Sequence, residues 1–430
     1  MDLRRSGQLK VSIVLSVLAV GLSLSRSVRA EVSIIKTDAW ELYTEGRVNA
    51  FFSYGFGDAN PQEQPGEHIP LGGGLNTGND DIPKIGPDGM PLPGQGTFQS
   101  MRLRSGFIPN VFAVGLRRTL SEDTTVSAYI AIWATIESSN QRKAVPVYAD
   151  ARQGYLKIAS QRWGTLTAGR ALDLFSRGAT QNDFLYGHGY GLGYPGNIDD
   201  TGPTNGLIGF GVLAAFFTPG IMYETPSLGG FQLALGIYDP TLLVGAYGAT
   251  REARPEAELM YDFASGPLKA HLFANGAFQN FYNVATNVSA AAYGAGYGGR
   301  IEVGPVHLGV AGHYGKGLGM NYAFEGGAVA VSQSLAFRWF DGYSAFAQVV
   351  ANHFDFNAGW GISRTFPLDE DKMTGANISV PQQWAASAGV VYHATDYLHF
   401  DVDYVHAHTN WTLGERQVMN FINTGITVTW

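Results

Sequence analysis

The segment Phe231-Gln-Leu-Ala-Leu-Gly-Ile-Tyr238 alternates between large apolar residues and small or polar ones. Successive side chains of an extended strand point to opposite faces, so the odd-numbered residues would form one apolar face. The even-numbered residues would form a small or polar face. The same alternation recurs in Val306–Tyr314 and Val418–Trp430. The pattern predicts β-strands, although by itself it does not decide between a soluble sandwich and a membrane barrel.

The connections between these segments are of two kinds. Short turn signals, such as Ser265-Gly-Pro267, Asp341-Gly342 and Thr395-Asp396, alternate with long polar or glycine-rich stretches. Short turns on one side and long loops on the other are typical of an all-β, transmembrane antiparallel β-barrel. We count sixteen strands, beginning near Trp40, Gln99, Thr125, Arg152, Thr165, Gly220, Phe231, Ala257, Leu268, Tyr293, Val306, Val331, Tyr343, Trp384, Tyr397 and Val418.

Composition agrees with this fold class. Only 15% of the 430 residues are charged, 56 are glycine and none is cysteine, so a disulfide scaffold and a thiolate metal site are excluded. Leu207–Phe217, the longest apolar run after the first thirty residues, is too short and too interrupted to span a bilayer as a helix. Trp430, at the end of an alternating strand, resembles the C-terminal aromatic of outer-membrane barrels, although phenylalanine is the usual residue there.

Residues 1–30 have the features of a cleaved signal peptide. A basic start is followed by the apolar stretch Val11–Leu24 and by the small-x-small sequence Val28-Arg29-Ala30. Removal of this segment would take away five basic residues and one acidic residue. The remaining chain, 31–430, would have 23 basic and 35 acidic residues and a net charge of −12. This charge disfavours nucleic acid as a partner.

Three stretches, in order, resemble the Gram-negative trimeric porin family. They are Glu41-Leu-Tyr-Thr-Glu-Gly-Arg47, the pair Arg152–Leu156 with Trp163–Arg170, and Gly220–Phe231. The resemblance implies a homotrimeric sixteen-stranded barrel in the outer membrane, in contact with its lipids and open to small hydrophilic solutes and ions. It also implies that residues 171–219 fold into the lumen as a pore-constricting loop.

A porin selects at its constriction by pore width and by fixed charges. The resemblance and the strand pattern nominate Arg47, Arg102, Arg104, Arg152 and Arg170 on the wall, and Asp173, Asp183, Asp199 and Asp200 on the loop. Asp183 is the first choice among the acids, although a solvated loop charge is the alternative for each of them. The alternation around Arg152 leaves its face ambiguous. We expect a mild preference for cations.

The function that follows is passive diffusion through a water-filled channel, without enzymatic activity, cofactor or metal. A substrate-selective channel, with a binding track of His, Tyr and Trp, is the first alternative. A barrel enzyme is the second, because histidines and acids occur together on late strands: His399, Asp401, Asp403 and His406. His406 and His408 lie two residues apart, yet no third metal ligand is evident.

Overall fold

The computed structural model describes residues 31–59, 61, 81–136, 149–185, 204–241, 251–283, 287–324, 336–369, 380–411 and 414–430. The predicted signal peptide and the two loop acids Asp199 and Asp200 lie outside these residues. Among the described residues, no helix has the length and apolar character needed to cross a membrane.

Almost all of the regular structure is β-strand, and one short helix, α1, covers Arg177–Asn182. The strands are β1 Val32–Lys36, β2 Glu41–Asp58, β3 Asp81–Ile85, β4 Pro91–Arg104, β5 Asn110–Ser121, β6 Thr124–Ala134, β7 Ala149–Ser160, β8 Gly164–Leu172, β9 Phe217–Glu224, β10 Phe231–Tyr238, β11 Arg254–Ser265, β12 Leu268–Asn283, β13 Val288–Val303, β14 Val306–Lys316, β15 Trp339–Ala351, β16 Phe354–Phe366, β17 Gln382–His393, β18 Leu398–Asn410 and β19 Arg416–Thr429.

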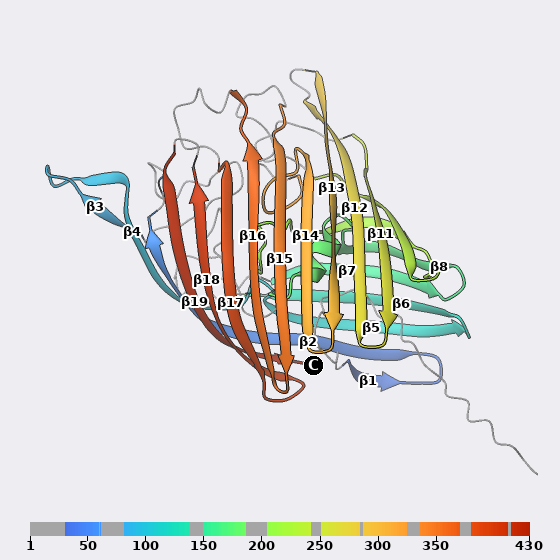
Figure 1. The fold of residues 1–430 in the computed structure, drawn as a ribbon. Coiled ribbons are helices and arrows are strands. Elements are labelled where there is room, and N and C mark those ends of the chain that lie inside the picture. Colours follow the sequence, from blue (N-terminus) through green and yellow to red (C-terminus); the bar gives the residue numbers. More distant parts are fainter. Residues whose placement is uncertain are drawn as a thin grey trace, which may run out of the picture.

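These strands close into an antiparallel barrel of sixteen strands, as the sequence predicts (Figure 1). Each strand from β5 to β19 pairs with the next one along the chain, and β19 pairs with β2 to close the ring. β4 and β5 act together as the second strand of the barrel, because β4 pairs with Phe51–Asp58 and β5 with Glu41–Arg47. The pairing of β19 with β2 leaves no free first or last strand in the ring.

Connections at the two ends of the barrel differ in length, as predicted. At one end, here called the turn end, they run from two residues (122–123) to six (225–230). The other end, the loop end, has the long connections, among them 173–216 and 317–338. Figure 1 shows the C-terminus at the turn end, which an even number of strands requires.

The predicted strand start at Tyr343 is wrong, and the one at Val331 lies outside the described residues. The strands in question begin at Trp339 and Phe354, and the predicted turn Asp341-Gly342 lies inside β15. Gly342 is needed there because a β-carbon would lie 2.2 Å from the ring of His313. The real turn is Asn352-His353, and Asn352 has φ of 54°, which suits a tight hairpin.

β1 and β3 are additional to the predicted sixteen strands. β1 pairs with the start of β2, and Glu31 just before it forms a 2.7 Å ion pair with Arg117. β3 and the first part of β4 form a hairpin that projects sideways from the loop end of the barrel (Figure 1).

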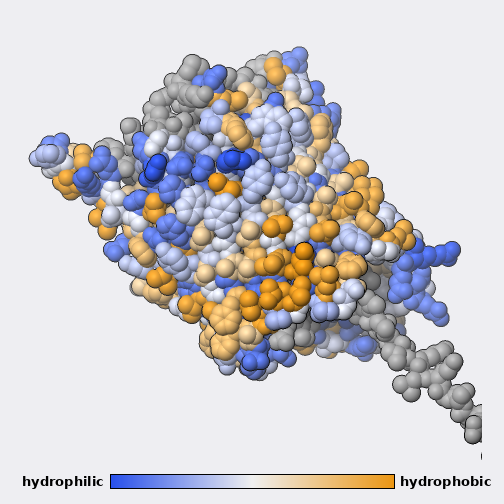
Figure 2. All heavy atoms as spheres, viewed as in Figure 1, coloured by the Kyte–Doolittle hydropathy of each residue, from blue (hydrophilic) through white to orange (hydrophobic). Residues whose placement is uncertain are grey.

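The outer face of the wall is apolar and the inner face is largely polar. Outward side chains such as Leu103, Ile130 and Val310 are 71%, 60% and 59% exposed. Figure 2 shows hydrophobic residues gathered on the outside of the wall, with hydrophilic residues at both ends. The inward positions carry side chains such as Asn275 and Gln279. This arrangement suits a non-aqueous exterior.

Trp430 completes the seam between the first and last strands of the barrel. Its backbone N–H donates to Gly46 O at 3.0 Å, and its carbonyl accepts from Gly46 N–H at 2.7 Å. Its ring lies 6.3 Å from that of Phe112 and so close to Gly46 that a β-carbon there would overlap it.

Deletion of Trp430 is therefore expected to lower the yield of closed barrel, because it removes both the final hydrogen bonds and the ring that covers the seam. The yield is measured as the fraction with altered gel mobility before heating. Trp360→Ala, which removes an outward ring from the middle of β16, is the control and should fold at nearly the normal yield. Normal folding of the truncated chain would contradict the role of Trp430.

Candidate channel lumen and constriction

The long connection between β8 and β9 folds into the barrel, as predicted. It leaves the wall after Leu172, forms α1 and returns at Phe217. The ring of Phe184 lies 6.0 Å from that of His307 and 6.4 Å from that of Phe346, both on the inner wall. Its described residues are almost all buried, so this loop occupies part of the lumen.

Arg177 fixes the loop to the wall through two carboxylates. Its Nε donates to Glu258 Oε2 at 2.7 Å, and its Nη1 donates to Glu224 Oε1 at 3.0 Å. The side chains of Arg177 and Glu258 are each only 1% exposed. The Gly178 N–H also donates to Glu258 Oε1, at 3.2 Å. Removal of one partner from a buried ion network is costly, because a charge is left without compensation.

Asp173 forms a second attachment at the place where the loop begins. Arg254 Nη2 donates to Asp173 Oδ2, and Thr218 donates to the same carboxylate through its N–H and its hydroxyl. Arg254 is also paired with Glu256, whose Oε2 accepts from Phe175 N–H at 2.7 Å. Asp173 is thus enclosed between loop and wall, with 3% exposure.

Asp183 holds the two described halves of the loop together. Its carboxylate accepts from Leu185 N–H at 2.9 Å and from Leu207 N–H at 2.7 Å, and the residue is 2% exposed. Farther along, Thr204 Oγ1 accepts from Ile108 N–H at 2.7 Å, in the break between β4 and β5. The loop therefore reaches the wall on both sides of the lumen.

Small residues on β13 make room for α1. The inward glycines of this strand belong to the sequence Gly294-x-Gly-x-Gly298, and α1 packs against β12, β13 and β14. A β-carbon at Gly178 would lie 2.3 Å from the ring of Phe273, and one at Gly298 would lie 2.8 Å from it. Glycine at these positions lets the helix approach the wall.

Arg47, Arg102 and Arg104 all lie on the inner face of the wall. Their strand neighbours Val48 and Leu103 are outward, at 51% and 71% exposure. Arg47 is close enough to Asp401 and His399 to act on their charge. The structure therefore places these three predicted residues on the lumen side of β2 and β4.

A β-bulge resolves the face of Arg152. Ala151 and Arg152 together oppose Ile132, so the alternation of β7 shifts by one residue there. Arg152 then covers the ring of inward Trp133 at 4.6 Å and donates to Asp150 Oδ2 at 3.0 Å. Arg170 lies 3.6 Å from the same carboxylate.

The structure thus joins the predicted arginines of β7 and β8 at one carboxylate, that of Asp150. It separates them from Asp173 and Asp183, whose carboxylates are held inside the loop attachments. None of these observations measures ion selection, so the predicted constriction roles of all nine charged residues stay predictions.

Sequence reasoning missed Asp150, which joins the arginines of β7 and β8, and the residues that attach the loop: Arg177, Glu224, Arg254, Glu256 and Glu258. A signal for the last three was present, because Arg254, Glu256 and Glu258 occupy alternate positions of one strand. Charges at every second position of an otherwise apolar strand indicate an inward, protein-covered face. Nothing in the sequence alone indicates that Arg177 is their partner.

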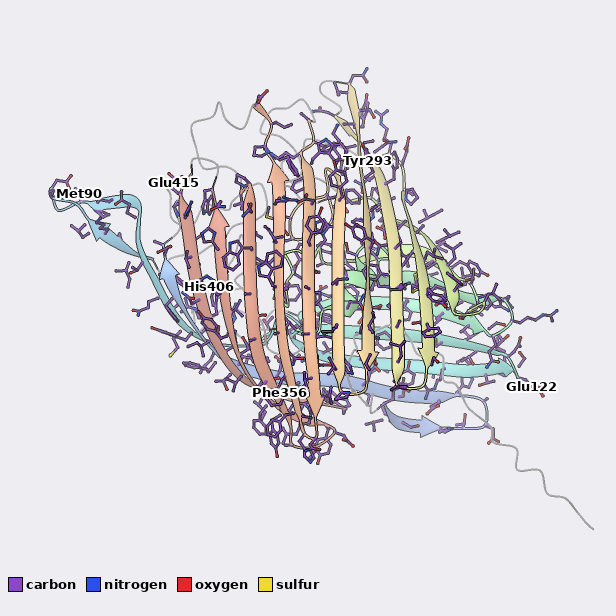
Figure 3. All side chains as sticks on the ribbon, in the orientation of Figure 1. Met90, Glu122, Tyr293, Phe356, His406 and Glu415 are labelled. Carbon is purple, nitrogen blue, oxygen red and sulfur yellow. The ribbon has the colours of Figure 1, made fainter. Side chains whose placement is uncertain are left out.

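The late-strand histidines and acids do not form one group. His406 faces outward, where Nδ1 contacts Asn420 Oδ1 at 2.9 Å and the ring lies 5.3 Å from that of Trp384 (Figure 3). Asp401 and Asp403 face inward. The wall therefore separates His406 from the two acids, whereas His399 lies on the same inner face as Asp401 and Asp403. In the described part of the chain, no three His, Asp or Glu residues are placed to hold a metal ion.

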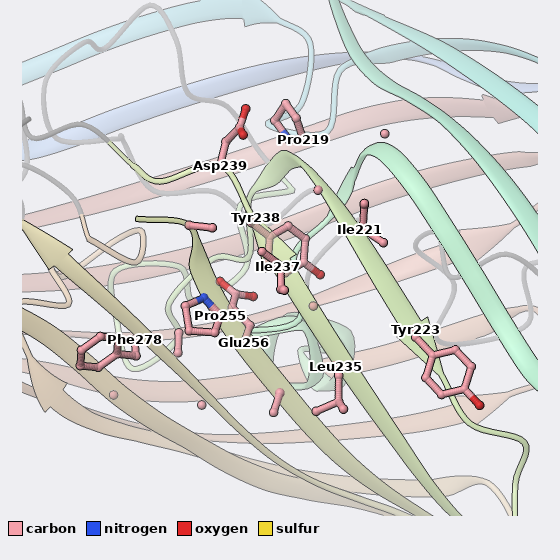
Figure 4. A pocket seen from close by; sticks show the side chains of 18 residues that line it. Pro219, Ile221, Tyr223, Leu235, Ile237, Tyr238, Asp239, Pro255, Glu256 and Phe278 are labelled. Atoms are coloured by element: carbon pink, nitrogen blue, oxygen red, sulfur yellow. The ribbon is translucent and has the colours of Figure 1, made fainter. Parts of the chain in front are cut away.

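An open groove of about 1120 Å³ lies on the outer face of β9 to β12 (Figure 4). Ile221 and Ile237, each 60% exposed, border it together with Phe278. Because these side chains point away from the lumen, the groove is part of the apolar exterior and not of the channel.

No protein-family model matches the chain, and a search of the curated proteins found no match. Solved structures with the same fold do exist. The outer membrane channel DcaP of Acinetobacter baumannii is 14% identical, with a TM-score of 0.64 over 93% of this chain and 100% of that one. The anion-selective porin from Comamonas acidovorans is 12% identical, with a TM-score of 0.57 over 91% and 100%.

The trimer form of OmpT, an outer membrane protein of Vibrio cholerae, is also similar. It is 13% identical, with a TM-score of 0.53 over 91% of this chain and 100% of that one. Identities this low establish likeness of fold. The chain has the barrel fold of the outer-membrane porins, which confirms the resemblance found in its sequence at the level of the fold.

Proposed function

We propose that the protein is an outer-membrane porin of a Gram-negative bacterium, which forms a water-filled channel for passive diffusion of small hydrophilic solutes and ions. The observation that carries the proposal is the reversal of polarity across a closed wall. Apolar side chains cover the outside, while polar and charged groups line the inside. Such a wall is stable in lipid and admits water. The turn end would face the periplasm.

In this proposal residues 171–219 narrow the pore. Support comes from the two buried attachments at Asp173 and Arg177, and from the contact of Thr204 with Ile108. A loop fixed at several points keeps its position while solutes pass, so it sets a constant pore width.

The function is tested with purified protein in planar lipid bilayers and in liposomes. We expect stepwise conductance in potassium chloride, and swelling rates that fall smoothly with the size of neutral sugars. Rates that depend on sugar stereochemistry rather than size would favour a substrate-selective channel. Absence of any conductance from folded, inserted protein would overturn the proposal.

Replacement of Arg177 should release the loop. Arg177→Met leaves Glu224 and Glu258 buried without their cation, so we expect folding to lose about 3–5 kcal/mol and the pore to become wider and noisier. Thermal unfolding and single-channel conductance measure the two effects.

Arg117→Met is the matched control. Arg117 also joins two carboxylates, those of Glu31 and Glu41, but its side chain is 36% exposed at the turn end. An exposed pair contributes at most about 1 kcal/mol, so this variant should keep both stability and conductance. Equal behaviour of the two variants would contradict the role of Arg177 as a loop attachment.

We also propose that the protein is a homotrimer, as the family resemblance implies. The trimer form of the similar Vibrio cholerae protein supports this assignment. Purified protein should therefore run as a trimer before heating and as a monomer afterwards, because closed barrels resist detergent. A monomer in both unheated gels and native mass measurement would contradict it.

A further inference from the structure

A group of aspartates lies on the inner face of the late strands. On the described strands β14 to β19, the inward positions carry Asp355, Asp401 and Asp403 but no lysine or arginine. The arginines at positions 47, 102, 104 and 152 lie on the strands β2, β4 and β7. The two loop acids with described positions, Asp173 and Asp183, are enclosed by their own partners.

The three aspartates lie together on β16 and β18. Val391 of β17 is the register partner of both Asp355 and Asp401, so these two residues share one level of the barrel. Asp403 lies one inward position beyond Asp401 and pairs with Asn423 of β19. We call Asp355, Asp401, Asp403 and Asn423 the lumen acid patch.

The lumen acid patch has more acceptor atoms than donors. Asp403 Oδ1 accepts from Asn423 Nδ2 at 2.8 Å, and Asp355 Oδ2 contacts His393 Nε2 at 2.9 Å. Among the described residues, Asp403 Oδ2, Asp355 Oδ1 and Asn423 Oδ1 have no hydrogen-bond partner. The exposures of Asp355, Asp403 and Asn423 are 1%, 3% and 0%.

Carboxylate and amide oxygens of this kind require a donor or a positive charge, because a buried acceptor without a partner is costly. An ammonium group offers three donors and no acceptor, and alkali cations also bind oxygen. His393, which contacts Asp355, retains 20% side-chain exposure.

We propose that the lumen acid patch is the acidic side of the channel, where it takes monovalent cations, including the ammonium group of a permeating solute. The inference rests on the proposed channel function and deepens it. It moves the cation-attracting charge from the loop, where sequence reasoning put it, to the wall at β16 and β18. The nearest wall arginines lie on β2 and β4, which follow β18 and β19 in the ring.

The test measures the zero-current potential of purified channels in planar bilayers under a tenfold potassium chloride gradient. We expect Asp401→Asn and Asp403→Asn each to lower the ratio of cation to anion permeability about twofold or more, and the double variant to lower it further. The change should shrink in concentrated salt, where charges are screened. Ammonium chloride in place of potassium chloride should show the same loss.

Asp341→Asn is the matched control, because Asp341 is a buried aspartate of β15 on the outer side of the wall, paired with Arg364. It removes the same charge and should leave the potential unchanged. Asn423→Asp adds a charge to the patch and should raise cation preference, so the proposal stays testable if the asparagine variants fail to fold.

This inference would be overturned if the wild type, the Asp401→Asn/Asp403→Asn double variant and Asn423→Asp all conduct with the same ion preference. The proposed channel function would stand in that case. Folded, inserted protein without conductance would instead overturn the proposed function itself.

Discussion

Closure of the ring between β2 and β19 is the constraint on which the rest of the molecule depends. A wall with an apolar outer face has no water outside to satisfy backbone N–H and C=O groups, so each strand must have a neighbour on both sides. Closure fixes the alternation of faces, since every residue points either outward or into the lumen. It also makes the lumen a confined space in which a long loop can be held.

Within that space, several charged side chains hold the loop against the wall. Arg177 and Arg254 attach the loop to β9 and β11 through buried carboxylates. These acids are therefore engaged with the fold. In our proposal, the charges left to face a permeating ion come mainly from the wall.

Much of the fold can be predicted from local sequence patterns. The residues that hold the loop in the lumen can be predicted far less well. Alternation such as that of Phe231–Tyr238 reports directly which side chains face outward, and the count of sixteen strands is confirmed. Alternation does not reveal a single inserted residue, such as the one in the β-bulge at Arg152. It also does not reveal that Gly342 is a glycine because its neighbour His313 leaves no room for a side chain, and not because it forms a turn. Loop attachments such as Arg177 with Glu258 join residues 81 positions apart, and no local pattern specifies such a pair.

The seam at Trp430 also has a consequence for the order in which the chain folds. Its indole Nε1 contacts Thr44 Oγ1 at 3.5 Å across 386 positions of sequence. Contacts of such high sequence separation form slowly, because a very long segment must be ordered before they contribute. No N-terminal fragment contains both sides of this seam. β2 must therefore wait, unpaired on that side, until Trp430 has been synthesised, and protection of this early edge is a requirement of the chain's biogenesis.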